Sequence, residues 1–250
     1  DASEVAEVRR IVHSVDWCEV HVVERPKNLG LGRNVLSGVT HVAEQYPAFV
    51  VWEDDLICVR GTYAWMCAAL LTYADDPRVM SVSGWTHPRV TPSGTGEVSY
   101  FDVRAESWSW GAWSRSWRGM LDETALEKMA AVKGRGIDPA TCGSDLPAQA
   151  RDELPRNLWA ARWLYHHLLH DGLCLRPPWS MVDHQGFDAS ATNAPVASGW
   201  EHRLLRAAPP VPTNWPSPVE TSGCRQLWRA AYPSRPKRWL QRVRAKIFPN

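Results

Sequence analysis

The strongest constraint on the fold is a regular alternation between helical and strand-like segments in the first third of the chain. Apolar residues recur with the spacing of a helix face in three segments, at 3–15, 33–45 and 62–74. Short apolar runs typical of strands follow each of them, at 20–23, 48–52 and 79–84. Strands separated by helices usually join into one largely parallel sheet, with the helices packed on its faces. The pattern therefore predicts an α/β fold.

The rest of the chain continues this pattern less regularly. A helix at 156–169 and a strand at 173–175 are predicted, whereas residues 118–155 have the mixed composition of an insertion or a lid. Residues 207–223 are rich in Pro, Ser and Thr, a composition that suits a linker or a segment that wraps around the domain in an extended conformation. We therefore expect three parts: one domain over residues 1–206, a linker over 207–223 and a basic tail over 224–250.

Composition places the chain among globular proteins and predicts no membrane-spanning helix. Hydrophobic residues make up 44% and charged residues 22% of the 250 residues, which excludes a disordered chain. The longest uncharged apolar stretch, Tyr63 to Ala74, is far shorter than the ~20 residues that cross a bilayer. The six cysteines are scattered with no CxxC pair, which favours reduced thiols over disulfides or a zinc site. These features predict a cytoplasmic protein.

The overall charge of +1 hides an asymmetry between the body and the tail. Every charged residue in 224–250 is Lys or Arg, so residues 1–223 are acidic. An acidic body with one short basic block argues against nucleic acid as a partner. Within the tail an apolar stripe falls between the basic residues, formed by Trp239, Leu240, Val243 and Ile247. Such a helix suits either peripheral contact with the inner face of an anionic membrane or docking on the body of the protein.

Three consecutive acids, Glu53, Asp54 and Asp55, follow the predicted strand at 48–52. Adjacent carboxylates repel one another unless they are solvated or share a cation. Alternate side chains of a strand share a face, so Glu53 and Asp55 are expected to point together and Asp54 away. Oxygen ligands suit Mg²⁺ or Mn²⁺, which takes the rest of its shell from water and a bound diphosphate. The alternative is a solvated acidic turn that binds nothing.

Further motifs accompany these acids in a fixed order. The segment Asn28-x-Gly30-x-x-Arg33-Asn34 precedes them, WSWGAWSRSW lies at 108–117, and GFDASAT lies at 186–192. With these motifs the chain resembles glycosyltransferases of the GT-A fold, which use nucleotide sugars and carry a DxD-type motif. The sequence EDD is similar to the variant found in family 2-like and N-acetylglucosaminyltransferase I-like enzymes of bacterial type. The resemblance covers about residues 5–195.

The resemblance implies roles on the donor side of a site. Asp55 is expected to bind Mn²⁺ or Mg²⁺ directly, with Glu53 and Asp54 around the ribose and donor sugar. The nucleotide would be lined by the upstream motif, through Asn28, Arg33 and Asn34. In the alternative, Arg33 and Asn34 only cap a neighbouring carbonyl and a helix start.

Aromatic and imidazole side chains are further candidates. The tryptophans of the WSWGAW segment, Trp108, Trp110 and Trp113, offer faces on which a sugar ring can stack, with Trp110 assigned to the donor site. Equally, they belong to the core. Two histidines, His184 and His202, are candidates to complete the metal shell from the C-terminal side, although a lone histidine is more often an ordinary hydrogen-bonding residue.

Inverting transfer requires a carboxylate that takes the proton from the acceptor hydroxyl. In the family that this chain resembles, the base lies near the start of the helix predicted at 156–169, where this chain has Asn157 and Leu158. The nearest substitutes are Asp152 and Glu153, followed by Asp145 and Asp188. Each of these acids is alternatively a surface or capping residue.

The sequence thus indicates a metal-dependent, inverting glycosyltransferase. Its donor would be a UDP- or GDP-sugar and its acceptor a glycan or a glycolipid. The expected fold is a Rossmann-like, mostly parallel sheet flanked by helices and lacking its first strand, because the chain begins in what corresponds to the first helix of the family. The alternatives are a degenerate carbohydrate-binding domain of the same fold and a sugar nucleotidyltransferase.

Overall fold

The computed structural model describes residues 2–186 and 207–233, and the chain divides into two units at Gly30. In the first unit, α1 (Ala2–His13) is followed by an irregular segment that Glu24 ties to the helix, through Arg9 at 3.0 Å and His13 at 2.9 Å. The strand predicted at 20–23 is wrong, since this segment has no strand partner within the described part of the unit. The apolar face of α1 is about half exposed at Val5, Val8 and Ile11.

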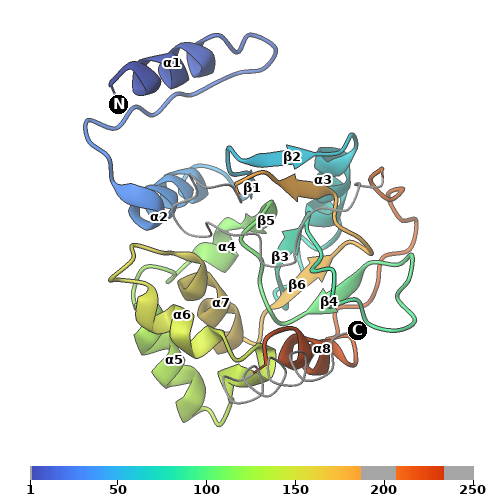
Figure 1. The fold of residues 1–250 in the computed structure, drawn as a ribbon. Coiled ribbons are helices and arrows are strands. Elements are labelled where there is room, and N and C mark those ends of the chain that lie inside the picture. The colour runs from blue at the N-terminus through green and yellow to red at the C-terminus, as the bar shows by residue number, and fades with distance from the viewer. Residues whose placement is uncertain (1, 187–206, 234–250) are drawn as a thin grey trace, which may run out of the picture. The chain divides into compact units, whose positions relative to one another are not determined.

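The second unit, residues 31–250, is built on a sheet of five strands in the order β1-β5-β3-β6-β4. The strands are β1 (Ala48–Val51), β3 (Val79–Ser83), β4 (Tyr100–Asp102), β5 (Trp110–Trp113) and β6 (Leu173–Arg176). A separate two-stranded sheet pairs β2 (Leu56–Cys58) with β7 (Val182–His184). The protein therefore has a mixed α/β fold (Figure 1).

The prediction of a mostly parallel sheet is wrong, because only the β3–β6 pairing is parallel among the described strands. Strands β1, β3 and β6 do run in the same direction, as the helix–strand alternation implies. The tryptophan-rich strand β5 lies between β1 and β3 and pairs antiparallel with both. The carboxyl ends of β1, β3 and β6 still meet at one edge of the sheet, which is where α/β sheets bind ligands.

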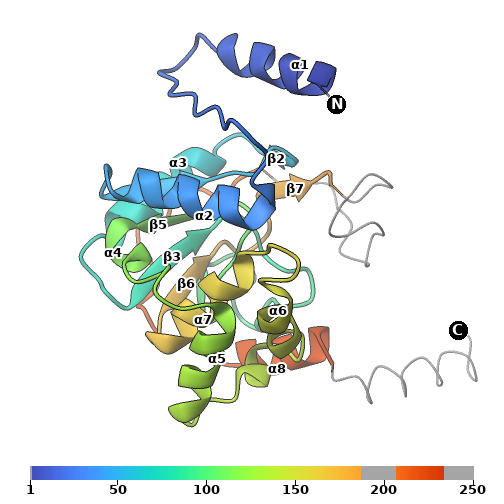
Figure 2. The same cartoon turned by 90° about the vertical axis from the view of Figure 1, so that its left-hand side faces the viewer.

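Helices cover both faces of this sheet (Figures 1 and 2). Strand β5 shows why, since its neighbouring residues point to opposite faces. Trp110 packs on Trp163 in α7 (Ala160–Leu169), with ring centroids 5.0 Å apart. A Cβ at the next residue, Gly111, would lie 3.1 Å from Leu70 in α3 (Thr62–Thr72). The sheet is thus buried between α3 and the group that contains α7.

The remaining helices enclose the tryptophan-rich core. They are α2 (Gly30–Ala43), α4 (Ser114–Trp117), α5 (Ala125–Gly134), the 3₁₀ helix η1 (Pro139–Cys142) and α6 (Leu146–Asp152). Thr124 caps α5 and forms a capping box with Glu127, as the sequence TALE suggests. Trp117 packs on Trp110 and donates its indole N–H to Thr40 of α2 at 2.9 Å. Residues 118–155, which have the composition of an insertion, form this helical layer (Figure 2).

The segment expected to be a linker lies against the body of the second unit. Tyr73 donates its hydroxyl to the carbonyl of Pro216 at 2.6 Å, and Thr221 donates its N–H to the carbonyl of Phe101 in β4. The helix α8 (Cys224–Ala231) follows and buries Trp228. The first part of the basic tail is therefore docked on the body, whereas its stripe at 239–247 lies outside the described residues.

The structure also bears on what the sequence indicated about the cysteines and about membrane-spanning helices. All six cysteines are free thiols in this structure. Among the residues that the structure describes, none of the helices combines the length and the apolar character needed to cross a bilayer.

Candidate functional site

The three acids follow β1 at the edge of the sheet where β1, β3 and β6 end. The chain turns after Val51, and the N–H of Leu56 donates to the carbonyl of Glu53 at 3.3 Å. Glu53 and Asp55 are partly buried, whereas Asp54 is exposed. The prediction that Glu53 and Asp55 share a side is thus confirmed, although a tight turn rather than strand alternation produces the arrangement.

Pairing between β2 and β7 brings a histidine to these carboxylates. Leu56 lies opposite His184 in the ladder, and the N–H of Gln185 donates to the carbonyl of Asp55 at 2.8 Å. His184 Nε2 is consequently 3.4 Å from Asp55 Oδ2. One ligand atom from each of Glu53, Asp55 and His184 lies within 4.8 Å of the others. Such a cluster has the dimensions of a cation site.

The electrostatics of the cluster fit an oxygen-liganded cation. Asp55 Oδ1 is buried without a hydrogen-bond partner, which is costly for a carboxylate unless a cation is bound. Burial, together with Asp55, Asp54 and Glu106, raises the pKa of Glu53 to about 7. A divalent cation would offset both the desolvation and the repulsion between the carboxylates. The residues present therefore fit Mg²⁺ or Mn²⁺, with Asp55 and Glu53 as the oxygen ligands.

His184 faces Asp55 with a nitrogen that carries a proton. Its Nδ1 accepts a hydrogen bond from the N–H of Gly186 at 3.0 Å, so the neutral ring carries its proton on Nε2, the nitrogen that faces Asp55. Burial lowers the pKa of His184, which keeps the ring neutral at pH 7. In this tautomer the protonated Nε2 faces Asp55 Oδ2 at 3.4 Å. Direct ligation of a cation by Nε2 would require the proton to leave it.

Binding of a cation at this cluster is expected to weaken as the pH falls below 7. Glu53, with its pKa near 7, is ionised at high pH and protonated at low pH. Because the proton and the cation compete for this carboxylate, the Kd for Mn²⁺ should rise by about tenfold per pH unit well below 7. Electron paramagnetic resonance titrations of Mn²⁺ between pH 5.5 and 8 measure this. A constant Kd over that range would contradict a role for Glu53 as a ligand.

Gly186 is required for the close approach of Asp55. A Cβ at Gly186 would lie 2.3 Å from Asp55 Oδ2 and 2.8 Å from His184 Cε1, closer than packed atoms can come. Gly186→Ala is therefore expected to displace the carboxylate and to raise the Kd for Mn²⁺ roughly tenfold or more. Calorimetric titration measures the effect. Gly96→Ala is the matched control, since a Cβ there meets no atom within 4 Å; equal affinities in the two variants would contradict this role.

A cavity of about 170 Å³ lies beside the cluster. Eleven residues line it: Trp85, Arg104, Ala105, Glu106, Ser107, Trp108, Gln149, Ala160, Leu164, Trp228 and Tyr232. Trp108 connects the two sites, because its ring lies 4.4 Å from the ring of His184. Glu106 also connects them, since its charge contributes to the raised pKa of Glu53. The cavity thus adjoins the cluster at Trp108.

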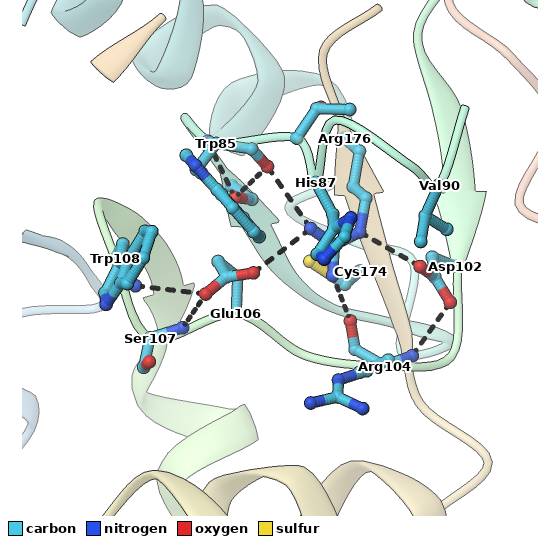
Figure 3. A network of polar contacts seen from close by, with 12 residues as sticks. Trp85, His87, Val90, Asp102, Arg104, Glu106, Ser107, Trp108, Cys174 and Arg176 are labelled. Atoms are coloured by element: carbon cyan, nitrogen blue, oxygen red, sulfur yellow. Dashed lines mark hydrogen bonds and ion pairs between the residues drawn. The ribbon is translucent and has the colours of Figure 1, made fainter. Parts of the chain in front are cut away.

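A buried ion-pair network holds the wall of the cavity (Figure 3). Arg176, at the end of β6, is inaccessible to solvent and donates to Asp102 at 3.1 Å and to Glu106 at 3.3 Å. The other oxygen of Glu106 accepts the N–H of Ser107 at 2.9 Å. Arg104 forms a two-pronged ion pair with Asp145 at 2.7 and 3.0 Å. The network fixes the loop from β4 to β5 against β6.

The charged residues of this network were not found by sequence reasoning. Arg104, Glu106 and Arg176 belong to no motif with a characteristic spacing, and they come together through the pairing of β4 with β6. The tryptophan-rich sequence WSWGAW correctly indicated this segment, but the tryptophan assigned to the donor site, Trp110, is not the one that lines the cavity. Trp110 is fully buried between Phe49 and Trp163, so its assignment to the donor site is wrong, and Trp113 is also buried. Trp108 is the tryptophan of this segment that reaches the site.

The acids chosen as the base have other partners. Glu153 is 1% exposed, accepts the N–H of Ala125 at 2.7 Å and pairs with Arg162, so it anchors the start of α5 to α7. Asp152 forms an exposed pair with Arg156 at 3.7 Å. Its burial gives Glu153 a structural role, so the interpretation of Glu153 as the base is wrong, whereas that of the half-exposed Asp152 stays a prediction. Asp145 is the partner of Arg104.

Asn157, found where the resemblance leads one to expect an acid, caps α2. Its side-chain oxygen accepts the N–H of Arg33 at 3.1 Å, and its carbonyl accepts the N–H of Gly32 at 2.8 Å. The side chains of Arg33 and Asn34 are exposed on the first turns of that helix. Asn28 belongs to the first unit, where its side chain accepts the N–H of Gly30 at 2.7 Å. The nucleotide-binding roles of these residues stay predictions.

Two predicted residues, Asp188 and His202, lie outside the part of the chain that the structure describes. A scan against protein-family models finds no match, and neither does a search of curated proteins. The functional assignment therefore depends on the geometry of the cluster and the cavity.

Proposed function

We propose that this protein is a metal-dependent glycosyltransferase of the GT-A type, which moves a sugar from a nucleoside diphosphate sugar to a hydroxyl of a glycan or glycolipid with inversion. The observation that carries the proposal is the Glu53, Asp55 and His184 cluster, which adjoins an aromatic cavity at the carboxyl ends of β1, β3 and β6. Two adjoining compartments of different chemistry suit a reaction between an anionic donor and a neutral acceptor.

The cluster would hold the diphosphate of the donor through a cation. Bound Mn²⁺ or Mg²⁺ neutralises the charge that develops on the leaving diphosphate. Asp55 and Glu53 would hold the cation, and His184, whose Nε2 lies 3.4 Å from Asp55 Oδ2, would orient Asp55. The ring of Trp108 packs against His184, with ring centroids 4.4 Å apart, next to the cluster.

The acceptor hydroxyl needs a carboxylate that receives its proton. Glu106 is the acid that lines the cavity, so among the described acids it is the best placed for contact with an acceptor there. Its carboxylate lies 3.3 Å from Arg176 Nη1.

Calorimetric titration tests the proposal. UDP, GDP and their common sugar conjugates are titrated into the protein with and without Mn²⁺. We expect one nucleotide series to bind, with binding that depends on Mn²⁺. No binding of any nucleotide to protein that circular dichroism shows to be folded would overturn the proposal.

A non-catalytic carbohydrate-binding domain of the same fold is the second candidate. The observation that favours it is Asn157, which caps α2 at the position where the resemblance implies an acid. Slow hydrolysis of a sugar nucleotide, dependent on Mn²⁺, would separate the transferase from a binding domain. Release of pyrophosphate from a nucleoside triphosphate and a sugar phosphate would instead identify a nucleotidyltransferase.

The remaining parts of the proposal concern partners and location. The expected contact with a membrane involves residues 234–250, which the structure does not describe. A cytoplasmic location with a glycolipid acceptor at the inner face of the membrane therefore stays a prediction. Flotation of the protein with anionic vesicles would support it.

A further inference from the structure

The cavity beside the cluster has the size of one six-membered ring. Its volume is about 170 Å³, and a protein cavity of ~150 Å³ accommodates benzene. Four aromatic side chains contribute to its walls, from three separate parts of the chain: Trp85, Trp108, Trp228 and Tyr232. Aromatic faces pack well against the C–H faces of a pyranose, whereas a flexible aliphatic chain gains no specific advantage from them.

The charges around the cavity argue against an anionic ligand. Arg104 is neutralised by its two-pronged pair with Asp145, and its guanidinium lies 4.4 Å from the ring of Trp228 and 4.6 Å from that of Tyr232. The second cation, Arg176, has two carboxylate partners, Asp102 and Glu106. Carboxylates therefore outnumber guanidinium groups in the network. A phosphate or diphosphate would meet no unpaired cation from this network.

The polar groups at the wall suit hydroxyls instead. Glu106 brings an acceptor that is ion-paired with Arg176, and its side chain is 11% exposed. Gln149, whose amide nitrogen donates to Asp145 at 2.8 Å, brings a neutral amide that carries both donors and an acceptor. A ligand with apolar faces and several hydroxyls at its edge satisfies both kinds of wall.

We infer that this cavity binds one neutral pyranose ring, the acceptor sugar of the proposed transferase, stacked on the aromatic walls and hydrogen-bonded through Glu106. That this sugar is the acceptor depends on the proposed function. That the cavity binds a neutral sugar depends only on the residues that line it. Because α8 supplies Trp228 to the wall, the C-terminal segment completes the sugar site rather than acting as a linker beyond it.

Saturation-transfer NMR without metal or nucleotide tests the inference. The probes are the methyl glycosides of glucose, galactose, mannose, rhamnose and N-acetylglucosamine, with methyl glucuronide as an anionic counterpart of the glucoside. We expect at least one neutral glycoside to bind and the glucuronide to bind much more weakly than the neutral ligand. Trp108→Ala and Glu106→Gln should each weaken binding by about fivefold or more. Trp108 is only partly buried, so its loss leaves the core intact.

Tyr46→Ala serves as the control, because Tyr46 is 50% exposed and does not line the cavity. Its affinity for the glycoside should match that of the unaltered protein. Failure of every neutral glycoside to bind, binding unaffected by both cavity variants, or equal binding of the glucuronide would each overturn the inference. If glycosides bind but no nucleotide does, the sugar site stands and the transferase proposal falls. Nucleotide binding without glycoside binding would overturn the sugar site and leave the transferase proposal standing.

Discussion

Asp55→Ala is expected to abolish the Mn²⁺-dependent part of nucleotide binding, with a loss of affinity on the order of 100-fold. Asp55 stands at the centre of the cluster, since its Oδ2 lies beside His184 and its Oδ1 is buried without a partner. Removing this carboxylate takes away the principal oxygen ligand and leaves Glu53 alone. Calorimetry with the nucleotide that binds the unaltered protein, with and without Mn²⁺, measures the loss.

The stability of the Asp55→Ala protein should not fall, because a repulsive carboxylate is removed from Glu53. Thermal unfolding without metal checks this point and separates a lost ligand from a lost fold. Asp75→Ala is the matched control, an exposed acid outside the cluster, and its nucleotide affinity should be unchanged. Retention of Mn²⁺-dependent binding by Asp55→Ala would remove the cluster from the proposed mechanism.

Local sequence patterns predicted the elements of this fold better than their arrangement. Helical periodicity located α2 and α3, and the apolar runs located β1, β3 and β6. The pairing of strands depends on long-range contacts that periodicity does not contain. Strand β5 has the sequence WGAW, whose Gly111 lets it pack closely against Leu70 and Val82, and this allows it to lie between β1 and β3. The alternation of helices and strands along the sequence does not predict that a later strand inserts antiparallel between two earlier ones.

In the candidate site, too, sequence patterns predicted residues that are close in the chain better than residues brought together by strand pairing. Glu53 and Asp55 were predicted because the acids are consecutive in sequence and follow a strand. His184 was one of two candidate histidines, and only the β2–β7 ladder places it beside Asp55. The assignment of Trp110 failed because alternate residues of β5 face two buried layers, so that strand offers no exposed face. Glu106 was missed since its partner Arg176 is 70 residues away in the chain.

The network behind the cavity also predicts a large effect on stability. Asp102 is fully buried, and it accepts three hydrogen bonds: from Arg176 at 3.1 Å, from the indole of Trp228 at 2.6 Å and from the N–H of Arg104 at 3.0 Å. In Asp102→Asn one oxygen becomes an amide that cannot accept, and the buried charge of Arg176 loses a partner. We expect the free energy of unfolding to fall by about 3–5 kcal/mol.

Urea unfolding at pH 7.5 measures this change, and Asp76→Asn is the matched control. Asp76 also pairs with an arginine, at 2.6 Å from Arg78, but Arg78 is 60% exposed. An ion pair on the surface contributes only ~0–1 kcal/mol, so the control should unfold nearly as the unaltered protein does. Because Trp228 in α8 loses its acceptor only in Asp102→Asn, glycoside binding should weaken in that variant alone. Equal stabilities of the two variants would mean that the buried pair does not hold the cavity wall, and the sugar site would then require another support.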